Sequence, residues 1–319
     1  MIECESDGRS GNNIDDSSRI SKNNRKHREN GSIHSVFYLP TPVRSLGVNP
    51  AWQGNGATLC WREKMLLFDA HIHLEQYGEE EAAAFCRDSR VYGLIAVSMD
   101  LVSSRRTLAL KRRFPQKVFA ACGFHPEQKP VEIGPLVEWI RQNEAEIDAI
   151  GEIGLPYYLR QKARESGQPF DERNHLHILR TLLCLAKELK KPVILHAVYE
   201  DTARVCDLLE EYGIDQAHFH WIKTDSVTLE RMARAGYMVS FTPEIVYRQK
   251  TANIAAAYPL SLIMAETDGP WPFAGPFSGM RTTPFLLHAV IERIAALHKM
   301  DSDQAAEQLL QNTIRFIQG

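Results

Sequence analysis

The stretch FDAHIH, residues 68–73, places His71 and His73 around a single residue directly after an apolar run. Alternate residues of a β-strand point to the same face, so both imidazoles would lie on one side of a strand end. Two imidazoles in that position can begin a site for a transition-metal ion. Taken alone, the pair also fits a strand end with two ordinary polar residues, so the rest of the chain must decide.

Five further apolar runs end in histidine, glutamate or aspartate. These residues are His125 in GFHP, Glu152 in GEIG, His196 in VILHA, His218 and His220 in HFHW, and Glu266 and Asp268 in ETD. Any one of them alone fits a hydrogen-bonded residue at the end of a strand. Several ionisable groups buried close together are costly unless they are paired or coordinate a metal. Because imidazoles and carboxylates can become ligands of a divalent cation, the set as a whole predicts a metal site.

Short apolar segments alternate with longer helical patterns from Met65 onward. The segments that predict strands are 66–71, 91–98, 118–124, 148–154, 192–197, 216–221, 237–242 and 262–267. Helical patterns cover 79–89, 105–114, 134–147, 174–191, 202–213, 226–236, 282–300 and 302–317, with a weaker one at 249–258. Near-continuous apolar runs are typical of parallel strands buried on both faces.

This alternation predicts an α/β fold of the (β/α)8 TIM-barrel type, which commonly takes about 250 residues. A doubly wound open sheet is the alternative, but the chain lacks a Gly-rich G-x-G-x-x-G turn. Active sites of such barrels lie at the C-terminal ends of the strands. The histidines and carboxylates described above fall at that end.

The composition of the 319 residues is globular, with 44% hydrophobic and 24% charged residues. From Met65 onward the chain has 28 Lys and Arg against 33 Asp and Glu, so its overall field does not attract long polyanions. None of the six cysteines forms a C-x-x-C pair, which favours a reduced cytosolic chain. No apolar run is long enough to span a bilayer. We therefore expect a cytoplasmic location, with no membrane contact and no obligate protein partner.

Residues 1–64 differ from the rest in composition. They are rich in Ser, Asn and charge, and they predict a disordered extension ahead of a barrel domain at 65–319. A second interpretation is a start codon assigned too early, with Met65 as the true first residue, since the codons that WREK permits include a ribosome-binding sequence. In a genuine extension, the basic cluster RKHR at 25–28 could touch nucleic acid, although such clusters are usually solvated.

The order of the motifs resembles that of the TatD family of metal-dependent hydrolases, within the amidohydrolase-like barrels. The matching stretches are FDAHIH, GFHPE, AIGEIGL, VILHA, HFHW and ETDGPW, and QNTIRFI resembles the closing helix of that family. The resemblance covers residues 65–319. It implies a pair of divalent ions as cofactors.

Carried over residue by residue, the resemblance places one ion on His71, His73 and Asp268 and the other on His196 and His220, with Glu152 bridging both. His220 fits better than His218, because its distance to Gly236 suits the spacing of the family. His218 would lie on the same strand face and could support a ligand from behind.

The chain departs from the family pattern in its expected substrate pocket and not in its ligands. Pro156 stands where the family usually has an Asp, and Val198 where it often has an Arg. After His220 the family often reads Cys-Phe-Ser-Gly, but this chain has Trp221 and Lys223 there, and Arg281, Thr282 and Thr283 precede the proline where the family usually has Asn-Glu. An arginine fork suits a phosphodiester, so its loss weakens the case for DNA. Lys223 and Arg281 could supply replacement charge, or they could be solvated loop cations. Trp221 and Trp271, with Phe273, could stack on a base or pack at the barrel mouth.

The resemblance implies a hydrolase in which a metal-activated water attacks a phosphodiester of DNA or of a nucleotide. Asp268 would accept the proton of that water, Glu152 would hold the ions at a fixed separation, and His125 would orient the substrate oxygen. The ligand types favour Zn, Mn, Co or Fe, and Mg remains open if phosphate oxygens complete its shell. Two alternatives remain: hydrolysis of a carboxylic ester, amide or lactone, and an inactive barrel that serves as a binding subunit, although an inactive protein has no physical reason to retain the ligand set.

Overall fold

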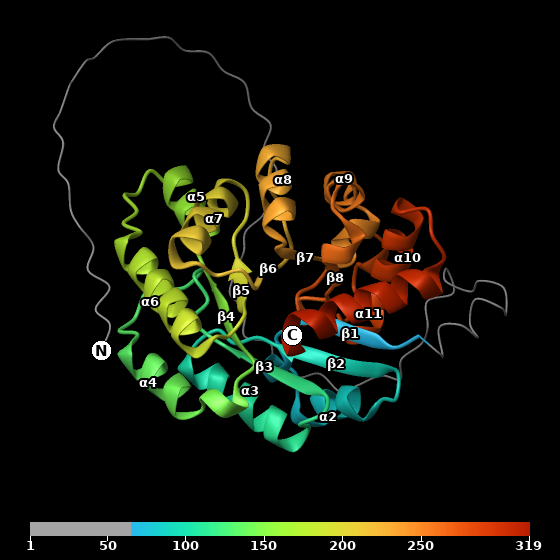
Figure 1. Cartoon of the computed structure of the whole chain (residues 1–319), viewed down its shortest axis with the longest axis horizontal. Coiled ribbons are helices and arrows are strands. Elements are labelled where there is room, and N and C mark those ends of the chain that lie inside the picture. The colour runs from blue at the N-terminus through green and yellow to red at the C-terminus, as the bar shows by residue number, and fades with distance from the viewer. Residues whose placement is uncertain (1–64) are drawn as a thin grey trace, which may run out of the picture. The chain divides into compact units, whose positions relative to one another are not determined.

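Eight parallel strands lie side by side in residues 65–319, the part of the chain that this computed structural model describes (Figure 1). They are β1 (Leu67–Ile72), β2 (Val91–Ala96), β3 (Val118–Cys122), β4 (Ala149–Gly154), β5 (Val193–His196), β6 (Ala217–Phe219), β7 (Met238–Phe241) and β8 (Ile263–Ala265). Each overlaps one of the apolar segments that predict strands, and neighbours in the sequence are neighbours in the sheet. The predicted (β/α)8 barrel is confirmed.

Helices follow the strands and cover the outer side of the sheet (Figure 1). They are α2 (Glu79–Arg87), α3 (Leu101–Arg113), α4 (Gly134–Gln142), α5 (Tyr157–Glu165), α6 (Arg173–Leu189), α7 (Glu200–Tyr212), α8 (Ser226–Ala235), α9 (Gln249–Ala257), α10 (Leu287–Leu297) and α11 (Ser302–Gln318). Only α5 among them lacks a matching pattern in the sequence. It has no buried residue, so it carries no apolar spacing to read.

Local signals fix where individual helices begin and end. The carboxylate of Asp100 accepts the N–H of Ser103, whose hydroxyl in turn receives the N–H of Asp100, a capping box that starts α3. Asp225 caps α8, and Gly236 ends that helix in the left-handed region at φ 77°.

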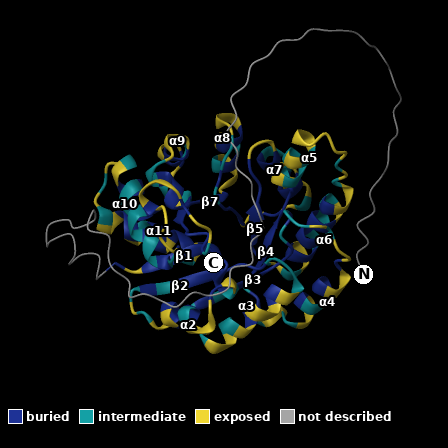
Figure 2. Cartoon of the chain, turned by 180° about the vertical axis from the view of Figure 1, so that it is seen from behind, coloured by how far each residue is buried: buried dark blue, intermediate teal, exposed yellow. Residues whose placement is uncertain are grey.

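The strands are buried on both sides, and the outer faces of the helices are exposed (Figure 2). Inside the sheet, Phe68, Ala121 and Met264 belong to one buried cluster that Phe316 of α11 also joins. The larger cluster lies between the sheet and its helices. No helix within residues 65–319 has the length and apolarity needed to cross a membrane. The expectations for residues 1–64 fall outside the described residues.

Backbone hydrogen bonds made just beyond the strand ends join the last strand to the first. The N–H of Asp268 donates to the carbonyl of His71 at 2.9 Å, and the N–H of His73 donates to the carbonyl of Gly269 at 2.8 Å. The seam of the barrel is therefore closed by the same residues that carry candidate ligands.

A buried carboxylate strengthens this seam from below. Asp69 is fully buried and accepts the N–H of Thr267 at 2.9 Å and the N–H of His71 at 3.2 Å. The hydroxyl of Thr267 donates to its second oxygen. Since buried N–H groups need acceptors, Asp69 ties the loop after β8 to the strand β1.

We expect Asp69→Ala to lower the free energy of unfolding by about 2–4 kcal/mol, since buried donors left without an acceptor cost about 1–3 kcal/mol each. Urea unfolding followed by circular dichroism, without added metal, measures the change. Asp215→Ala, at an exposed position before β6, is the control and should stay within about 0.5 kcal/mol of the wild type. Equal stability of the two variants would contradict this account of the seam.

Candidate metal centre

The predicted ligands come from the ends of β1, β4 and β5 and from the segments after β6 and β8, and their side chains converge. Three groups of side chains have ligand atoms within 4.8 Å of one another: His71, His73 and Asp268; His71, Glu152 and His220; and His125, Glu152 and His196. The structure thus brings all six predicted ligands together with His125. Their role as ligands remains a prediction.

The carboxylate of Glu152 lies at the centre of the cluster and is fully buried. Its Oε2 lies 3.2 Å from Nε2 of His71 and 3.5 Å from Nε2 of His73. Its Oε1 lies 2.8 Å from Nε2 of His220 and 3.0 Å from Nδ1 of His196. The two oxygens of one carboxylate therefore face two different pairs of imidazoles.

Asp268 completes the group around the first pair of histidines. Its Oδ1 lies 3.4 Å from Nε2 of His71 and 3.5 Å from Nε2 of His73. It reaches this position with a φ of 48°, in the left-handed region that non-glycine residues rarely adopt. Strain of this kind persists where the surroundings fix the backbone, as the seam does here, and it is frequent at functional sites.

The donor atoms of the cluster fit a divalent ion. Nε2 of His71, Oε2 of Glu152 and Oδ1 of Asp268 are buried and have no hydrogen-bond partner. Unpaired buried polar atoms are costly and rare in proteins. Ligand atoms about 2.1 Å from an ion lie about 3.0–3.4 Å apart in octahedral or tetrahedral geometry. The distances of 3.2 and 3.4 Å from His71 to the two carboxylates agree with that spacing.

The charges of the cluster are matched within it. Burial acts to raise the pKa of Glu152, but His125, His220 and His71 hold it well below its usual range. Burial acts to lower the pKa of His71, but Glu152 and Asp268 raise it well above its usual range. Burial, helped by the charge of His71, lowers the pKa of His220 to about 4. Carboxylates thus remain ionised here, as ligands must be.

Glu127 is a functional candidate to which the sequence analysis gives no role. Its Oε1 lies 3.5 Å from Nε2 of His196, the ring nitrogen that does not face Glu152. Its two oxygens also accept the N–H groups of Tyr158 and Leu159, each at 2.7 Å, at the start of α5. A carboxylate behind an imidazole orients that imidazole toward a metal. The sequence feature that could have identified Glu127 is its position in GFHPE, directly after the His-Pro pair.

Glu266 and His218 lie behind the cluster and not in it. Oε2 of Glu266 lies 3.8 Å from Nδ1 of His220, and its Oε1 accepts the N–H of Trp221 at 2.7 Å. Burial raises the pKa of Glu266 to about 8. His218 makes a hydrogen bond of 2.6 Å with the hydroxyl of Ser240. His220 therefore reaches the cluster, and His218 lies beneath it.

His125 directs an N–H toward the cluster. Its Nδ1 accepts the N–H of Glu127 at 3.1 Å, and its Nε2 lies 3.3 Å from Oε1 of Glu152. Burial lowers its pKa. Because Nδ1 is an acceptor, the proton of the neutral ring resides on Nε2. This tautomer suits a hydrogen-bond donor better than a metal ligand.

Three of the four candidate substrate residues gather beside the cluster. The rings of Trp221 and Trp271 have centroids 6.0 Å apart, and Nζ of Lys223 lies 4.4 Å from the ring centre of Trp221. Arg281 instead makes two hydrogen bonds of 2.6 Å with the carboxylate of Glu81. The substrate role of these residues remains a prediction.

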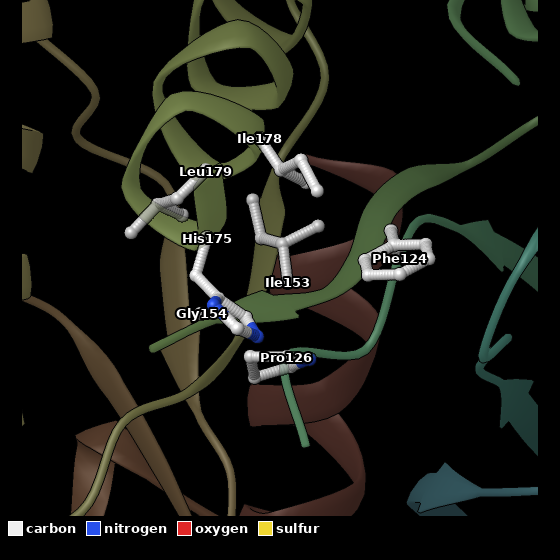
Figure 3. A pocket seen from close by; sticks show the side chains of 7 residues that line it. All are labelled: Phe124, Pro126, Ile153, Gly154, His175, Ile178 and Leu179. Atoms are coloured by element: carbon white, nitrogen blue, oxygen red, sulfur yellow. The ribbon is translucent and has the colours of Figure 1, made fainter. Parts of the chain in front are cut away.

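A narrow hollow between β4 and α6 lies on the helix side of the sheet (Figure 3). It is lined by Phe124, Pro126, Ile153, Gly154, His175, Ile178 and Leu179. Ile153 follows Glu152 on β4, so the two side chains point to opposite faces. The hollow has no room for a water molecule, which makes it a packing gap and not a substrate site.

Comparison with known proteins identifies the family. The model of the TatD related DNase family matches residues 68–318. The chain belongs to this family. A relative from Haemophilus influenzae, named as an uncharacterized metal-dependent hydrolase, is 34% identical over 254 residues, covering 79% of this chain and 99% of the relative. This chain is therefore a metal-dependent hydrolase of the TatD family.

Two further TatD family matches cover the same region. A Danio rerio protein, provisionally named a deoxyribonuclease, is 27% identical over 266 residues, covering 78% of this chain and 96% of the relative. The crystal structure of a TatD homologue from Escherichia coli superposes with a TM-score of 0.66 at 24% identity, covering 79% of this chain and 98% of that one. This likeness supports the barrel fold.

We expect Glu127→Gln to weaken metal binding by about 10- to 100-fold, the usual effect of losing a carboxylate behind a ligating imidazole. Titration of the purified protein with Zn²⁺ or Mn²⁺ against a competing chelator measures the affinity. Glu132→Gln, an exposed change in the following loop, is the matched control and should bind as the wild type does. Identical affinities for both variants would remove the role assigned to Glu127.

Proposed function

We propose that this TatD family protein hydrolyses phosphodiesters, in DNA or in nucleotides, with two divalent ions. The observation that carries the proposal is the buried carboxylate of Glu152, whose oxygens face separate groups of imidazoles. One carboxylate placed between two ligand groups suits a pair of ions held at a fixed separation.

The ligands divide between the two oxygens of Glu152. His71 and His73, together with Asp268, would hold one ion beside Oε2. His196 and His220 would hold the other beside Oε1. Imidazole and carboxylate donors suit Zn, Mn, Co or Fe, and Mg if substrate oxygens complete its shell.

The residues of this chain then handle protons and orientation. Bound divalent ions lower the pKa of water toward neutrality and so supply a nucleophile. The carboxylate of Asp268 would accept a proton from the attacking water and return it to the leaving oxygen. The Nε2–H of His125 would donate to a substrate oxygen, since its Nδ1 is occupied by the N–H of Glu127.

The phosphodiester is favoured by the family and by the name of the Danio rerio relative. A second candidate, hydrolysis of a carboxylic ester, amide or lactone, is favoured by Val198. Its side chain is buried and apolar at the position where the family resemblance expects an arginine fork. Both chemistries use the same ligands, so a substrate panel must separate them.

Metal analysis tests the number of ions. After reconstitution with Zn²⁺ or Mn²⁺, mass spectrometry of the metal content should approach two equivalents per chain. His196→Ala should retain the ion beside Oε2 and lose the other, whereas Glu152→Ala should lose both, because its two oxygens face both pairs of imidazoles. A reconstituted protein without bound metal would overturn the proposal.

Replacing one carboxylate oxygen of Asp268 by an amide NH2 group tests the assignment of this residue as proton acceptor. We expect Asp268→Asn to lower kcat by about 10²- to 10⁴-fold, the usual loss when an acid–base group is removed. The panel comprises bis(p-nitrophenyl) phosphate, single-stranded DNA, p-nitrophenyl esters and anilides. Asp303→Asn, on the exposed side of α11, is the control and should keep the full rate. An Asp268→Asn variant that works at the wild-type rate would refute the assignment.

A further inference from the structure

Lys223 places a partly buried ammonium beside the metal cluster. Its side chain is 20% exposed, and Nζ lies 4.4 Å from the ring centre of Trp221 and 4.0 Å from Oε2 of Glu244. Burial lowers the pKa of Lys223, while the charges of Glu244, Asp268 and Glu266 act to raise it. Trp221, whose ring the ammonium overlies, directly follows His220, and Glu266 links Trp221 to that histidine, so Lys223 lies beside the cluster.

The carboxylate beside Lys223 is already satisfied by other donors. Oε2 of Glu244 accepts Nε1–H of Trp221 at 2.8 Å and the hydroxyl of Thr251 at 3.1 Å. The distance of 4.0 Å from Nζ to Oε2 is too long for a hydrogen bond. Glu244 thus orients Lys223 by charge without occupying the donors of its ammonium.

Two neighbouring loops hold Lys223 in place. Trp221 has a φ of 42°, and its N–H is bound by Glu266, so the turn that leads to Lys223 is fixed. The backbone N–H of Tyr199, in the loop after β5, donates to the carbonyl of Lys223. A lysine with an anchored backbone and an ammonium lying over a tryptophan ring loses little conformational freedom when it binds a ligand.

Arg281 and Arg160 differ from Lys223, because each forms hydrogen bonds with a carboxylate, whereas Arg248 shares Glu244 with Lys223 at 3.7 Å and is largely exposed. Nε and Nη2 of Arg281 both donate to the carboxylate of Glu81. Arg160, on α5, donates to the buried carboxylate of Asp201 at 2.8 Å. Lys223 differs from Arg281 and Arg160, because no carboxylate lies within hydrogen-bond distance of its ammonium.

We propose that Lys223 binds an anionic oxygen of the substrate beside the metal cluster and thereby selects charged phosphodiesters over neutral esters. This inference rests on the proposed function and deepens it, since it chooses between the two chemistries described above. One ammonium matches one negative charge, whereas a neutral carboxylic ester offers it only an uncharged carbonyl oxygen, a weaker acceptor. Trp221 and Glu244 act as positioning residues for Lys223.

Lys223→Met tests the proposal, because methionine keeps much of the aliphatic stem and removes the charge. We expect KM for bis(p-nitrophenyl) phosphate to rise about 10- to 100-fold, the loss expected for one charge-assisted hydrogen bond, with a smaller change in kcat. Lys223→Arg should recover most of the loss. Lys250→Met, the same change on the exposed side of α9, should behave as the wild type.

The comparison with p-nitrophenyl acetate separates a charge effect from general damage. Hydrolysis of this neutral ester, where it is detectable, should be unchanged in Lys223→Met. An unchanged KM for the diester, or an equal loss on both substrates, would overturn the proposal. Thermal unfolding checks that Lys223→Met is folded. If Lys223→Met does not fold, Lys223→Gln is used in its place in every assay.

Binding of inorganic phosphate to the zinc-loaded protein provides a test without turnover. Calorimetry should find phosphate bound about 10- to 100-fold more weakly by Lys223→Met than by the wild type. If the wild type cleaves no phosphodiester, the proposed function fails, and the phosphate titration still decides whether Lys223 binds anions. Equal phosphate affinities would refute the anion site whatever the substrate.

Discussion

Matching of charge inside the barrel mouth is the constraint on which the rest of the structure depends. Glu152 is fully buried, and burial disfavours its ionised form. It remains an ionised carboxylate because imidazoles surround both of its oxygens. The cluster also contains buried atoms without hydrogen-bond partners, among them Nε2 of His71 and Oδ1 of Asp268. A cation resolves both conditions at once, which explains why such costly groups are collected in one place.

The strands, and the positions where the candidate ligands meet, could be predicted because both leave local marks in the sequence. Parallel strands buried on two faces read as apolar runs, and the polar residue that ends such a run lies at the functional end of the barrel. Glu152 and Asp268 follow this rule. Helix α5 does not, because a helix without buried residues has no apolar period.

Contacts between distant segments could not be predicted in the same way. Glu244 lies in a short turn after β7, and its partners Trp221 and Thr251 come from the preceding loop and the following helix. Arg281 is an unremarkable loop cation in the sequence, yet Glu81, 200 residues away, occupies its guanidinium. The sequence offers Lys223 and Arg281 as equivalent sources of positive charge, and tertiary pairing distinguishes them.

Closure of the barrel and completion of the ligand set depend on one seam. His71 arrives with the first strand and Asp268 after the eighth, and a backbone hydrogen bond joins them. During synthesis on the ribosome, the group formed by His71, His73 and Asp268 therefore stays incomplete until residue 268 has been translated. An ion held by this group would bind only after the seam has closed, and its binding would stabilise the closed barrel against opening between the first and last strands.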